Sequence, residues 1–426
     1  MRPASRPKPR RSAVRWMDYA RRSMQRLGHL KLVTALSEST GTTTLEGIAS
    51  RFQTAVTATF EVPQSIIPHM LDYIEAHRRA YRDRSVVAPR PLKVEIQDLY
   101  LSDPALPSGS GAITGDPERK GYRHAVYVEM PPWAVSLGLL RRGNYGTTDR
   151  GKALLALVPE TLDHFRTPSV EANPFLLDRA QRLFFLYALV EVDGDLLRCT
   201  YERLLAKAGS FTRSEVGDQI ADVLAELRRE RLKRASSGHE LAMSKRMQEV
   251  ESSVRKQSGS GMGPRESVAT PRTEPLVDCG ILSRISRDLY AYEFTEGGRR
   301  FLERLVQSES VTDFLEKGLA SAAGDMVGLA PREMALREIL SRVAASYQKV
   351  RRGLGYVSLR EVAALSVADA LRDGVLGFEL DDAETAVLEA AGKHGRRIRF
   401  ARARSASSVQ FRIDQKLVDE LVCTDP

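Results

Sequence analysis

A repeated segment constrains the fold of this chain more strongly than any other feature of its sequence. The segment from Glu274 to Leu305 contains, in order, an apolar helical stretch, a polar turn, an alternating strand and a second helix. The segment from Pro132 to Val158 has the same order, with its glycine, apolar and threonine positions in phase. Because internal repeats indicate successive copies of one structural unit, the sequence predicts at least two such units.

Glycine and threonine positions define the phase of the repeat. Gly138 corresponds to Gly280, and Thr148 corresponds to Thr295, each threonine preceding a glycine by three residues. Threonine is favoured immediately before a helix, where its side-chain oxygen accepts a backbone N–H. The copies differ in length only at the turn before the strand, where loops tolerate insertion. The pattern therefore predicts a capped helix after each hairpin.

This order of elements resembles the second half of a winged-helix domain. The shared features are a glycine followed by two apolar residues, a hairpin or wing, and the threonine-x-x-glycine ending. The resemblance is to the winged-helix (helix-turn-helix) superfamily. It implies a mainly α fold with short β-hairpins and tandem winged-helix units. It also implies contact with duplex DNA through the wing and through the third helix of a unit, which enters the major groove.

The C-terminal part of the chain has a related order of predicted elements. Ser358 followed by Glu361 has the spacing of a capping box at the start of a helix. The other predicted elements are helices at Pro331–Val350 and Leu380–Ala391 and strands at Ile398–Arg402 and Val409–Ile413. The sequence therefore predicts a third unit with a wing, although this unit lacks the threonine-x-x-glycine ending.

These patterns divide the chain into five parts. They are a basic disordered arm (1–15), a first winged-helix unit with an insertion at about 82–130 (16–165), a second unit (166–306), a connector (307–330) and a third unit (331–426). The prolines of the arm exclude a regular helix, and its arginines predict either contact with phosphates or a solvated tail.

Element boundaries follow from apolar periodicity and capping residues. Helices are expected at Trp16–Leu36, from Thr44, at Pro63–Tyr81, at Phe175–Leu189, at Leu196–Ala208, from Phe211 and from Thr270. Turns are expected at Asp193–Asp195, Ser283–Asp288 and Gly353–Val357.

Composition and charge indicate the class of partner. The formal net charge is +9 and the isoelectric point is near 9.4, which favours a polyanionic partner, with nucleic acid first. The three cysteines are far apart and odd in number, so they predict neither a disulfide framework nor a zinc site. A reducing, cytoplasmic and nucleoid-associated location follows. The chain has no apolar run long enough to span a membrane, so no membrane partner is expected.

Arginine and lysine residues in and beside the expected wings are the candidate DNA contacts, because phosphate contacts supply affinity. The C-terminal wing contributes Lys393, His394, Arg396, Arg397, Arg399, Arg402 and Arg404. The first unit contributes Arg141, Arg142, Arg150 and Lys152, and the second contributes Arg265, Arg272, Arg284 and Arg287. Each of these residues, taken singly, is more often a solvated surface side chain. The C-terminal cluster therefore carries the prediction.

Strand alternation gives the C-terminal wing a predicted basic face. Successive side chains of a strand point to opposite faces, so Arg397 and Arg399 fall opposite Ile398 and Phe400. Arg402 is expected to extend the same row. Such a row matches the spacing of duplex phosphates better than scattered cations do.

Residue patterns for catalysis are weaker. Asp116, Glu118 and Lys120 have the order of a nuclease core but lie in a Gly/Pro-rich loop instead of a strand. The candidate Mg²⁺ ligands are Asp193, Asp195, Asp381, Asp382 and Glu384. Turns and helix N-termini also favour such carboxylates. The glycine-rich stretches Gly109–Gly111 and Gly259–Gly261 do not continue into the Gly-Lys-Ser/Thr sequence of a phosphate-binding loop. The prediction is a chain that is not an enzyme and has no cofactor.

The sequence therefore predicts a non-catalytic protein that binds duplex DNA through basic wings and third helices. It is expected to act with a protein partner or as a homo-oligomer in a bacterial DNA-defence (antiviral), nucleoid or regulatory complex. Two alternatives remain open. One is a kleisin-like scaffold whose winged helices bind protein partners, and the other is the DNA-recognition part of a restriction-type nuclease.

Overall fold

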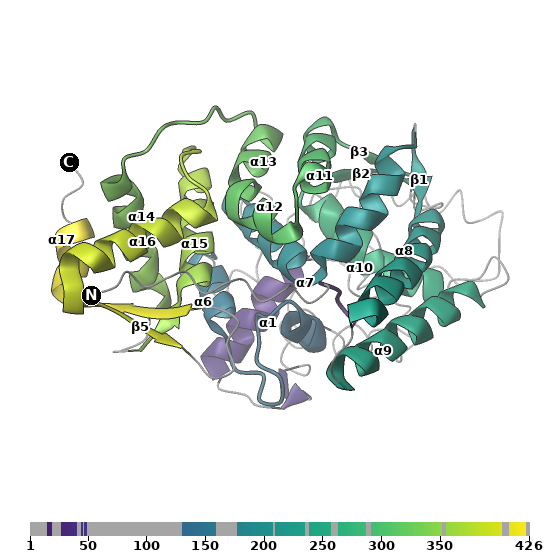
Figure 1. Cartoon of the computed structure of the whole chain (residues 1–426), viewed down its shortest axis with the longest axis horizontal. Coiled ribbons are helices and arrows are strands. Elements are labelled where there is room, and N and C mark those ends of the chain that lie inside the picture. The colour runs from purple at the N-terminus through teal and green to yellow at the C-terminus, as the bar shows by residue number, and fades with distance from the viewer. Residues whose placement is uncertain are drawn as a thin grey trace, which may run out of the picture.

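Two small antiparallel sheets are embedded in a mainly helical structure (Figure 1). The computed structural model describes residues 15–18, 27–40, 44–45, 47–48, 130–158, 177–207, 209–234, 238–256, 263–286, 291–351, 355–402 and 409–422. The predicted class, mainly α with short β-hairpins, is confirmed. No described helix combines the length and apolar content needed to cross a bilayer.

The repeat has the same hydrogen bonds in both copies. Thr148 precedes helix α6 (Asp149–Ala156), and Thr295 precedes helix α11 (Glu296–Gln307). Each threonine Oγ1 accepts the N–H of the glycine three residues later, at 3.0 Å in the first copy and 2.9 Å in the second. Each also donates to the carbonyl of the repeat's first glycine, at 2.5 and 2.7 Å. Those glycines, Gly138 and Gly280, have φ angles of 73° and 78°, which a side chain would disfavour.

In the first unit, helix α1 (Leu27–Thr40) and α6 are described, together with helical residues 130–136. Thr44 caps a helix as expected, since Gly47 N–H donates to its Oγ1 at 3.1 Å. The hairpin between residue 136 and α6 is reduced to one antiparallel bridge, Leu140 to Thr147.

The second unit contains three strands in the order β1-β3-β2. Its elements are α7 (Arg179–Leu205), β1 (Phe211–Thr212), α8 (Arg213–Arg234), α9 (Gly238–Arg255), α10 (Pro264–Asp278), β2 (Leu282–Ser286), β3 (Ala291–Phe294) and α11. Helices α8 and α9 form a hairpin between β1 and α10.

The third unit repeats this arrangement with the strand order β4-β6-β5. Its elements are α14 (Leu336–Val350), β4 (Val357–Ser358), α15 (Leu359–Arg372), α16 (Leu380–His394), the short 3-10 helix η1 (Gly395–Arg397), β5 (Ile398–Arg402), β6 (Val409–Ile413) and α17 (Gln415–Val422). The two strands of the wing have the predicted bounds. In both sheets the first strand pairs with the last, and the last pairs with the middle one.

The expected turn at Asp193–Asp195 is wrong, because α7 continues through it. Asp193 is buried and forms an ion pair with Arg272 at 2.6 Å, so its charge does not require solvent. A Cβ at Gly194 would collide with the side chain of Val311. The polar triplet therefore permits close packing inside a long helix instead of ending it.

Helix α10 begins at Pro264, earlier than the expected start at Thr270, and contains Pro271 and Pro275. The expected turn at Ser283–Asp288 is also corrected, because β2 occupies Leu282–Ser286. Likewise β1 takes Phe211 and Thr212, where a helix was expected to begin.

Several expected segments are replaced by other elements. Trp16 and Met17 lie in a non-helical stretch instead of in a helix. Residues 307–330, expected as a connector, include the packed helices α12 (Val311–Lys317) and α13 (Leu319–Met326). Val357, expected in a turn, lies in β4. The expected helix at 63–81, the insertion up to residue 129 and the arm up to residue 14 lie outside the described residues.

One hydrophobic core connects the three units. Helix α15 of the third unit packs against α7 of the second and α6 of the first. Figure 1 shows α8, α9 and the first sheet at one end of the molecule, and α14, α17 and β5 at the other. The C-terminal wing therefore lies far from the second unit's wing.

Candidate nucleic-acid interface

The C-terminal wing is a regular hairpin with one buried and one solvent-facing side. Ile398 pairs with Ile413, and both side chains are buried, as is that of Phe411. Phe400 is on the same side but is 39% exposed. The intervening residues therefore point away from the core, as strand alternation predicts.

Arg399 and Arg412 lie directly opposite each other on the outer side of the hairpin. Tyr356 comes one residue before β4, whose Val357 pairs with Phe411, so it lies at the level of Arg412. Tyr356 is 37% exposed. Like charges opposite each other on adjacent strands destabilise a sheet, which makes this row a favourable place for an anion.

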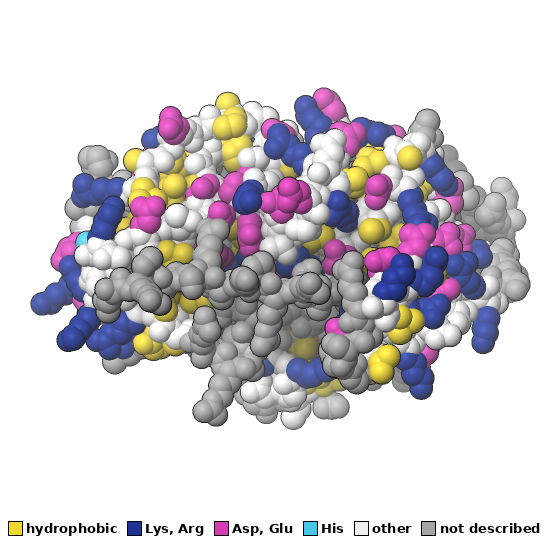
Figure 2. All heavy atoms as spheres, in the orientation of Figure 1, with side chains coloured by type: hydrophobic (Ala, Val, Ile, Leu, Met, Phe, Trp, Pro, Cys, Tyr) yellow, Lys and Arg dark blue, Asp and Glu magenta, His cyan; other side chains and the backbone are white. Residues whose placement is uncertain are grey.

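The corner between α16 and β5 adds further cations. Lys393, His394 and Arg396 are exposed at the end of α16 and in η1. Cations are favoured there because the end of a helix carries partial negative charge. Figure 2 shows Lys and Arg side chains gathered at the end of the molecule where Figure 1 places β5.

Four of these cations lack a carboxylate partner within the described part of the chain: Lys393, Arg396, Arg399 and Arg412. We call this set the wing cluster. Among the described residues, the one hydrogen bond that Arg399 donates goes to the backbone carbonyl of Arg396, at 3.2 Å. The Lys393 ammonium group and the three guanidinium groups of the wing cluster are therefore available to an external anion.

Arg397 differs from its neighbours because it forms an ion pair. Its Nη1 and Nη2 donate to the two carboxylate oxygens of Glu420 in α17, at 2.9 and 2.8 Å. This contact lowers the pKa of Glu420. Arg397 therefore joins the wing to α17, and a phosphate would compete with Glu420 for it.

The backbone register also corrects the predicted row of arginines. The pairing of β5 with β6 is regular, so position 402 is in phase with Ile398 and Phe400 and out of phase with Arg399. Arg404 and Arg287 lie outside the described residues. The outer row consists of Arg399 with Arg412 instead.

The third helix of this unit carries acids where a groove-binding helix would need cations. Asp381 and Asp382 lie in the first turn of α16, and Asp382 accepts the N–H of Glu379 at 2.8 Å. Glu379 in turn accepts the N–H groups of Ala320 and Ser321 at 2.7 Å. These carboxylates begin the helix and attach it to α13, so they repel phosphate at that end.

In the second unit, two predicted DNA contacts are buried. Arg272 is 2% exposed and paired with Asp193, and the Arg284 side chain is 3% exposed and paired with Glu274. Glu274 also accepts bonds from Arg213 and from the Tyr292 hydroxyl. Burial, and then Glu274, raise the pKa of Tyr292, so the phenol keeps its proton. Neither arginine can reach a phosphate without breaking its own buried ion pair, Arg272 with Asp193 and Arg284 with Glu274.

Arg265, another predicted DNA contact of the second unit, is partly exposed and paired with Asp218 at 2.9 Å. Helix α10 itself is buried from Val268 to Leu276. The helix that would enter a groove is thus covered by α7, α8 and α9. This unit does not offer a groove-binding surface on that helix.

In the first unit, Arg150 is also an internal residue. Its side chain is 11% exposed and donates to Glu361 of α15 at 2.9 Å and to the Leu137 carbonyl at 3.0 Å. Its guanidinium also lies 5.1 Å from the centre of the Tyr187 ring. Its predicted role as a phosphate contact is therefore replaced by a role between units.

The other cations of the first unit remain near the surface. Lys152 is paired with Asp149 at 3.4 Å. Arg141 and Arg142 are exposed in the short hairpin. These two arginines stay candidates for phosphate contact.

Sequence reasoning missed Arg412 and Tyr356. Arg412 was detectable, because Val409, Phe411 and Ile413 alternate and leave position 412 on the outer side. Tyr356 had no such signal, because β4 has only two residues and the sequence predicted a turn there. Only the pairing of β4 with β6 brings it beside the arginines.

The acidic candidates for Mg²⁺ have other partners. Asp193 pairs with Arg272, and the backbone N–H of Arg15 donates to Asp195 at 2.6 Å. Within the described ranges, no three His, Cys, Asp or Glu side chains lie together as metal ligands would. Burial raises the pKa of the Cys279 thiol, and it also raises the pKa of Cys199, which is less deeply buried. A raised pKa disfavours the reactive thiolate.

Comparison with known proteins gives no relatives. No protein-family model, no curated protein and no solved structure matches this chain.

Proposed function

We propose that this chain is a tandem winged-helix protein that binds duplex DNA, without catalysis, through its C-terminal wing. The order helix, strand, helix, helix and hairpin in the second and third units supports the superfamily assignment. So does the sheet order, in which the first strand pairs with the last strand of the hairpin. A wing of this kind contacts the backbone next to a groove.

The observation that carries the proposal is the wing cluster. Lys393, Arg396, Arg399 and Arg412 lie on one corner of the molecule without a carboxylate partner in the described part of the chain. Guanidinium groups form short, strong hydrogen bonds with phosphate oxygens. A phosphate between Arg399 and Arg412 would also remove the repulsion across the hairpin.

Contact through the wing fits the charges better than insertion of a third helix. Helix α16 begins with Asp381 and Asp382, and α10 is covered by other helices. Base edges are therefore not the main target, and phosphates are. The proposal is binding with little sequence preference and strong salt dependence.

The test is a mobility-shift titration of the full chain with duplex DNA at two salt concentrations. The variant is R396E/R399E/R412E, and the matched control is R179E/K245E/R337E, which changes three exposed arginine and lysine residues elsewhere by the same total charge. We expect the wing variant to lower the slope of log affinity against log salt by about 0.9 for each lost phosphate contact. The control should keep the wild-type slope.

Equal losses in both variants would show that net charge, and not the wing cluster, causes binding. Unchanged affinity in the wing variant would move the contact elsewhere, with Arg141 and Arg142 next in order. Absence of duplex binding by the wild-type chain would reject the proposal.

A second candidate is the kleisin-like scaffold, and the connection between units favours it. Arg150, Tyr187 and Glu361 join all three units through buried contacts, as a rigid platform for partners would require. In that case the wild-type chain would not shift duplex DNA at low salt.

A further inference from the structure

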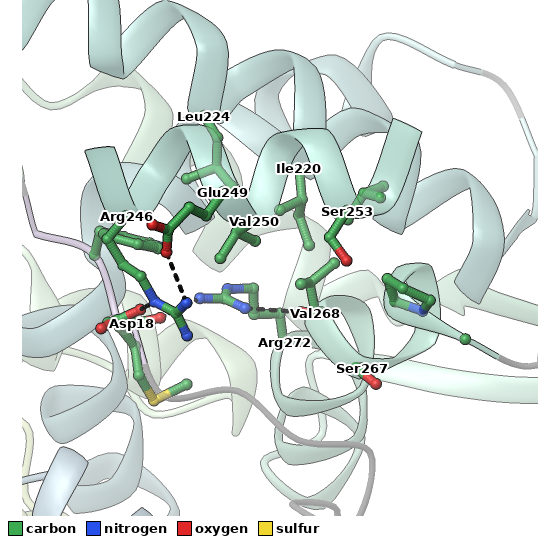
Figure 3. A pocket seen from close by; sticks show the side chains of 15 residues that line it. Asp18, Ile220, Leu224, Arg246, Glu249, Val250, Ser253, Ser267, Val268 and Arg272 are labelled. Atoms are coloured by element: carbon green, nitrogen blue, oxygen red, sulfur yellow. Dashed lines mark hydrogen bonds and ion pairs between the residues drawn. The ribbon is translucent and has the colours of Figure 1, made fainter. Parts of the chain in front are cut away.

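The segment Arg15–Asp18, which we call the N-terminal segment, lies in a groove lined by α8, α9 and α10 (Figure 3), and its backbone also contacts α7. Its backbone carries most of the polar contacts. Arg15 N–H donates to Asp195 at 2.6 Å, and Met17 N–H donates to Asp193 at 2.7 Å. Arg272 donates to the Met17 carbonyl at 2.8 Å. The segment is therefore held largely by its backbone, which peptides of other sequence share.

The side chains of the segment add selectivity. Trp16 is 8% exposed and Met17 is 3% exposed, both beside the apolar residues of α8 and α9. Asp18 accepts a bond from Arg246 Nε at 2.8 Å, and Arg246 also donates to Glu249 at 3.1 Å. Figure 3 shows Asp18 beside Arg246, with Val250 and Ile220 lining the groove beyond. The pattern held is aromatic, apolar, acidic.

The segment leaves part of the groove open. A cavity of about 440 Å³ remains next to Trp16 and Met17, lined by Ile220, Leu224, Val250 and Val254. Ligand sites in proteins have volumes of this size and a mostly apolar lining. A peptide with a further apolar side chain beside the positions of Trp16 and Met17 would therefore fill the groove more completely than the N-terminal segment does.

The groove also requires an occupant. Arg272 is 2% exposed and Asp193 is 1% exposed, and each makes one of its hydrogen bonds to the backbone of Met17. Removing the segment would leave buried charged groups short of partners, which is costly. The backbone N–H and C=O groups of another peptide can make the same two hydrogen bonds as those of Met17.

We propose that this groove is a peptide-binding site for an extended segment of a partner protein with the pattern aromatic, apolar, acidic. The N-terminal segment occupies it within the same chain and competes with the partner. The site is remote from the C-terminal wing, so it acts independently of DNA binding.

The experiment measures fluorescence anisotropy of a labelled peptide, AVRWMDYA, with the sequence of residues 13–20. It is titrated with the wild-type chain and with the full-length variant W16G/M17G, in which the internal competitor is weakened. We expect saturable binding to the variant, at least about tenfold tighter than to wild type, because an occupied site lowers apparent affinity by its free fraction. A peptide with the reversed sequence should bind neither protein.

A charge exchange separates recognition from a purely structural role. The variant R246E, combined with W16G/M17G, should lose AVRWMDYA and gain the peptide AVRWMKYA, in which lysine replaces the residue corresponding to Asp18. Circular dichroism and the thermal midpoint establish that each variant is folded. DNA binding by the same variants should remain unchanged.

Failure of a folded W16G/M17G variant to bind the peptide would overturn the proposal. Equal binding of the reversed peptide, or unchanged preference in R246E, would overturn it as well. A wild-type dimer that dissociates in W16G/M17G would support it and identify a second copy of the chain as the partner.

Discussion

At the scale of single residues, threonine and glycine determine how each hairpin joins its following helix. Thr148 and Thr295 make the same two kinds of bond in the two copies. The glycine three residues later allows the helix to contact the preceding chain. A Cβ at Gly298 would collide with the carbonyl of Ile281, and one at Gly151 with the carbonyl of Leu139. The sequence motif is therefore a packing requirement.

This requirement predicts opposite effects of the same substitution at two helical glycines. Gly298→Ala should destabilise the chain by about 1–3 kcal/mol, because the added methyl group overlaps backbone that cannot move freely. Gly392→Ala, in α16, has open space around its position and should be neutral or stabilise by about 0.5–1 kcal/mol. Urea unfolding measures both. Equal effects would show that the close approach at Gly298 is absent.

The burial and the partners of individual charged side chains were the properties hardest to predict from the sequence. Arg150, Arg272 and Arg284 were predicted to contact DNA, yet all three are buried beside acids. Arg150 pairs with Glu361 and Arg272 with Asp193, and both acids are far from their partners along the chain. Local composition therefore gives no sign of these two pairs. An arginine in one of these repeated units therefore cannot be assigned to DNA until the acidic residues around it in the folded chain are known.

At the scale of elements, the C-terminal hairpin and the helix after Thr295 match the predictions from sequence, and the long helices do not. The strands of the C-terminal wing and the helix after Thr295 have the predicted positions. Helix α7 continues through the residues where a turn was predicted, and α10 begins before its predicted first residue. In both cases burial against other helices outweighs the local preference of the sequence.

Helix α15 contributes a buried carboxylate, Glu361, that contacts the first and second units. Glu361 lies between Arg150 of α6 and Tyr187 of α7, and the side chains of Glu361 and Arg150 are each 11% exposed. Burial, and then Glu361, raise the pKa of Tyr187, so this phenol donates a hydrogen bond as a neutral group. Glu361 therefore holds three helices from three units together.

Glu361→Ala should destabilise the chain by about 3–5 kcal/mol, because it leaves Arg150 buried without its partner. The double variant R150M/E361L should recover most of that loss, since apolar residues need no pairing. Glu226→Ala, which removes an exposed partner of Arg203, should cost at most about 1 kcal/mol. Urea denaturation provides the three values. A loss in the double variant as large as in Glu361→Ala would contradict a paired buried charge.

At the scale of the whole molecule, the three units share one core and several ion pairs. Arg360 approaches Glu316 at 3.2 Å, Glu191 at 3.7 Å and Glu384 at 3.8 Å, and Arg372 pairs with Asp178 at 2.8 Å. These residues belong to the second and third units and to α12. The wing cluster is therefore presented by a unit whose second helix is fixed to the rest.

Shared contacts of this kind predict cooperative unfolding. Scanning calorimetry of the full chain should show one transition for the described units, with a van't Hoff enthalpy close to the calorimetric enthalpy. Glu361→Ala should move that transition to lower temperature as a whole. A separate early transition in the variant alone would show that the third unit unfolds independently, and one in the wild type would contradict the shared core.

The sequence by itself determined the class of the fold, the repeat, the caps and the bounds of the C-terminal wing. These properties depend on residues near one another along the chain, so period and capping chemistry are sufficient to predict them. Only the tertiary structure decided which arginines face solvent, that Arg412 and Tyr356 lie beside Arg399, and that Trp16 and Met17 occupy a groove. The reason is that burial and ion pairing depend on partners from other units, and no local pattern specifies those partners.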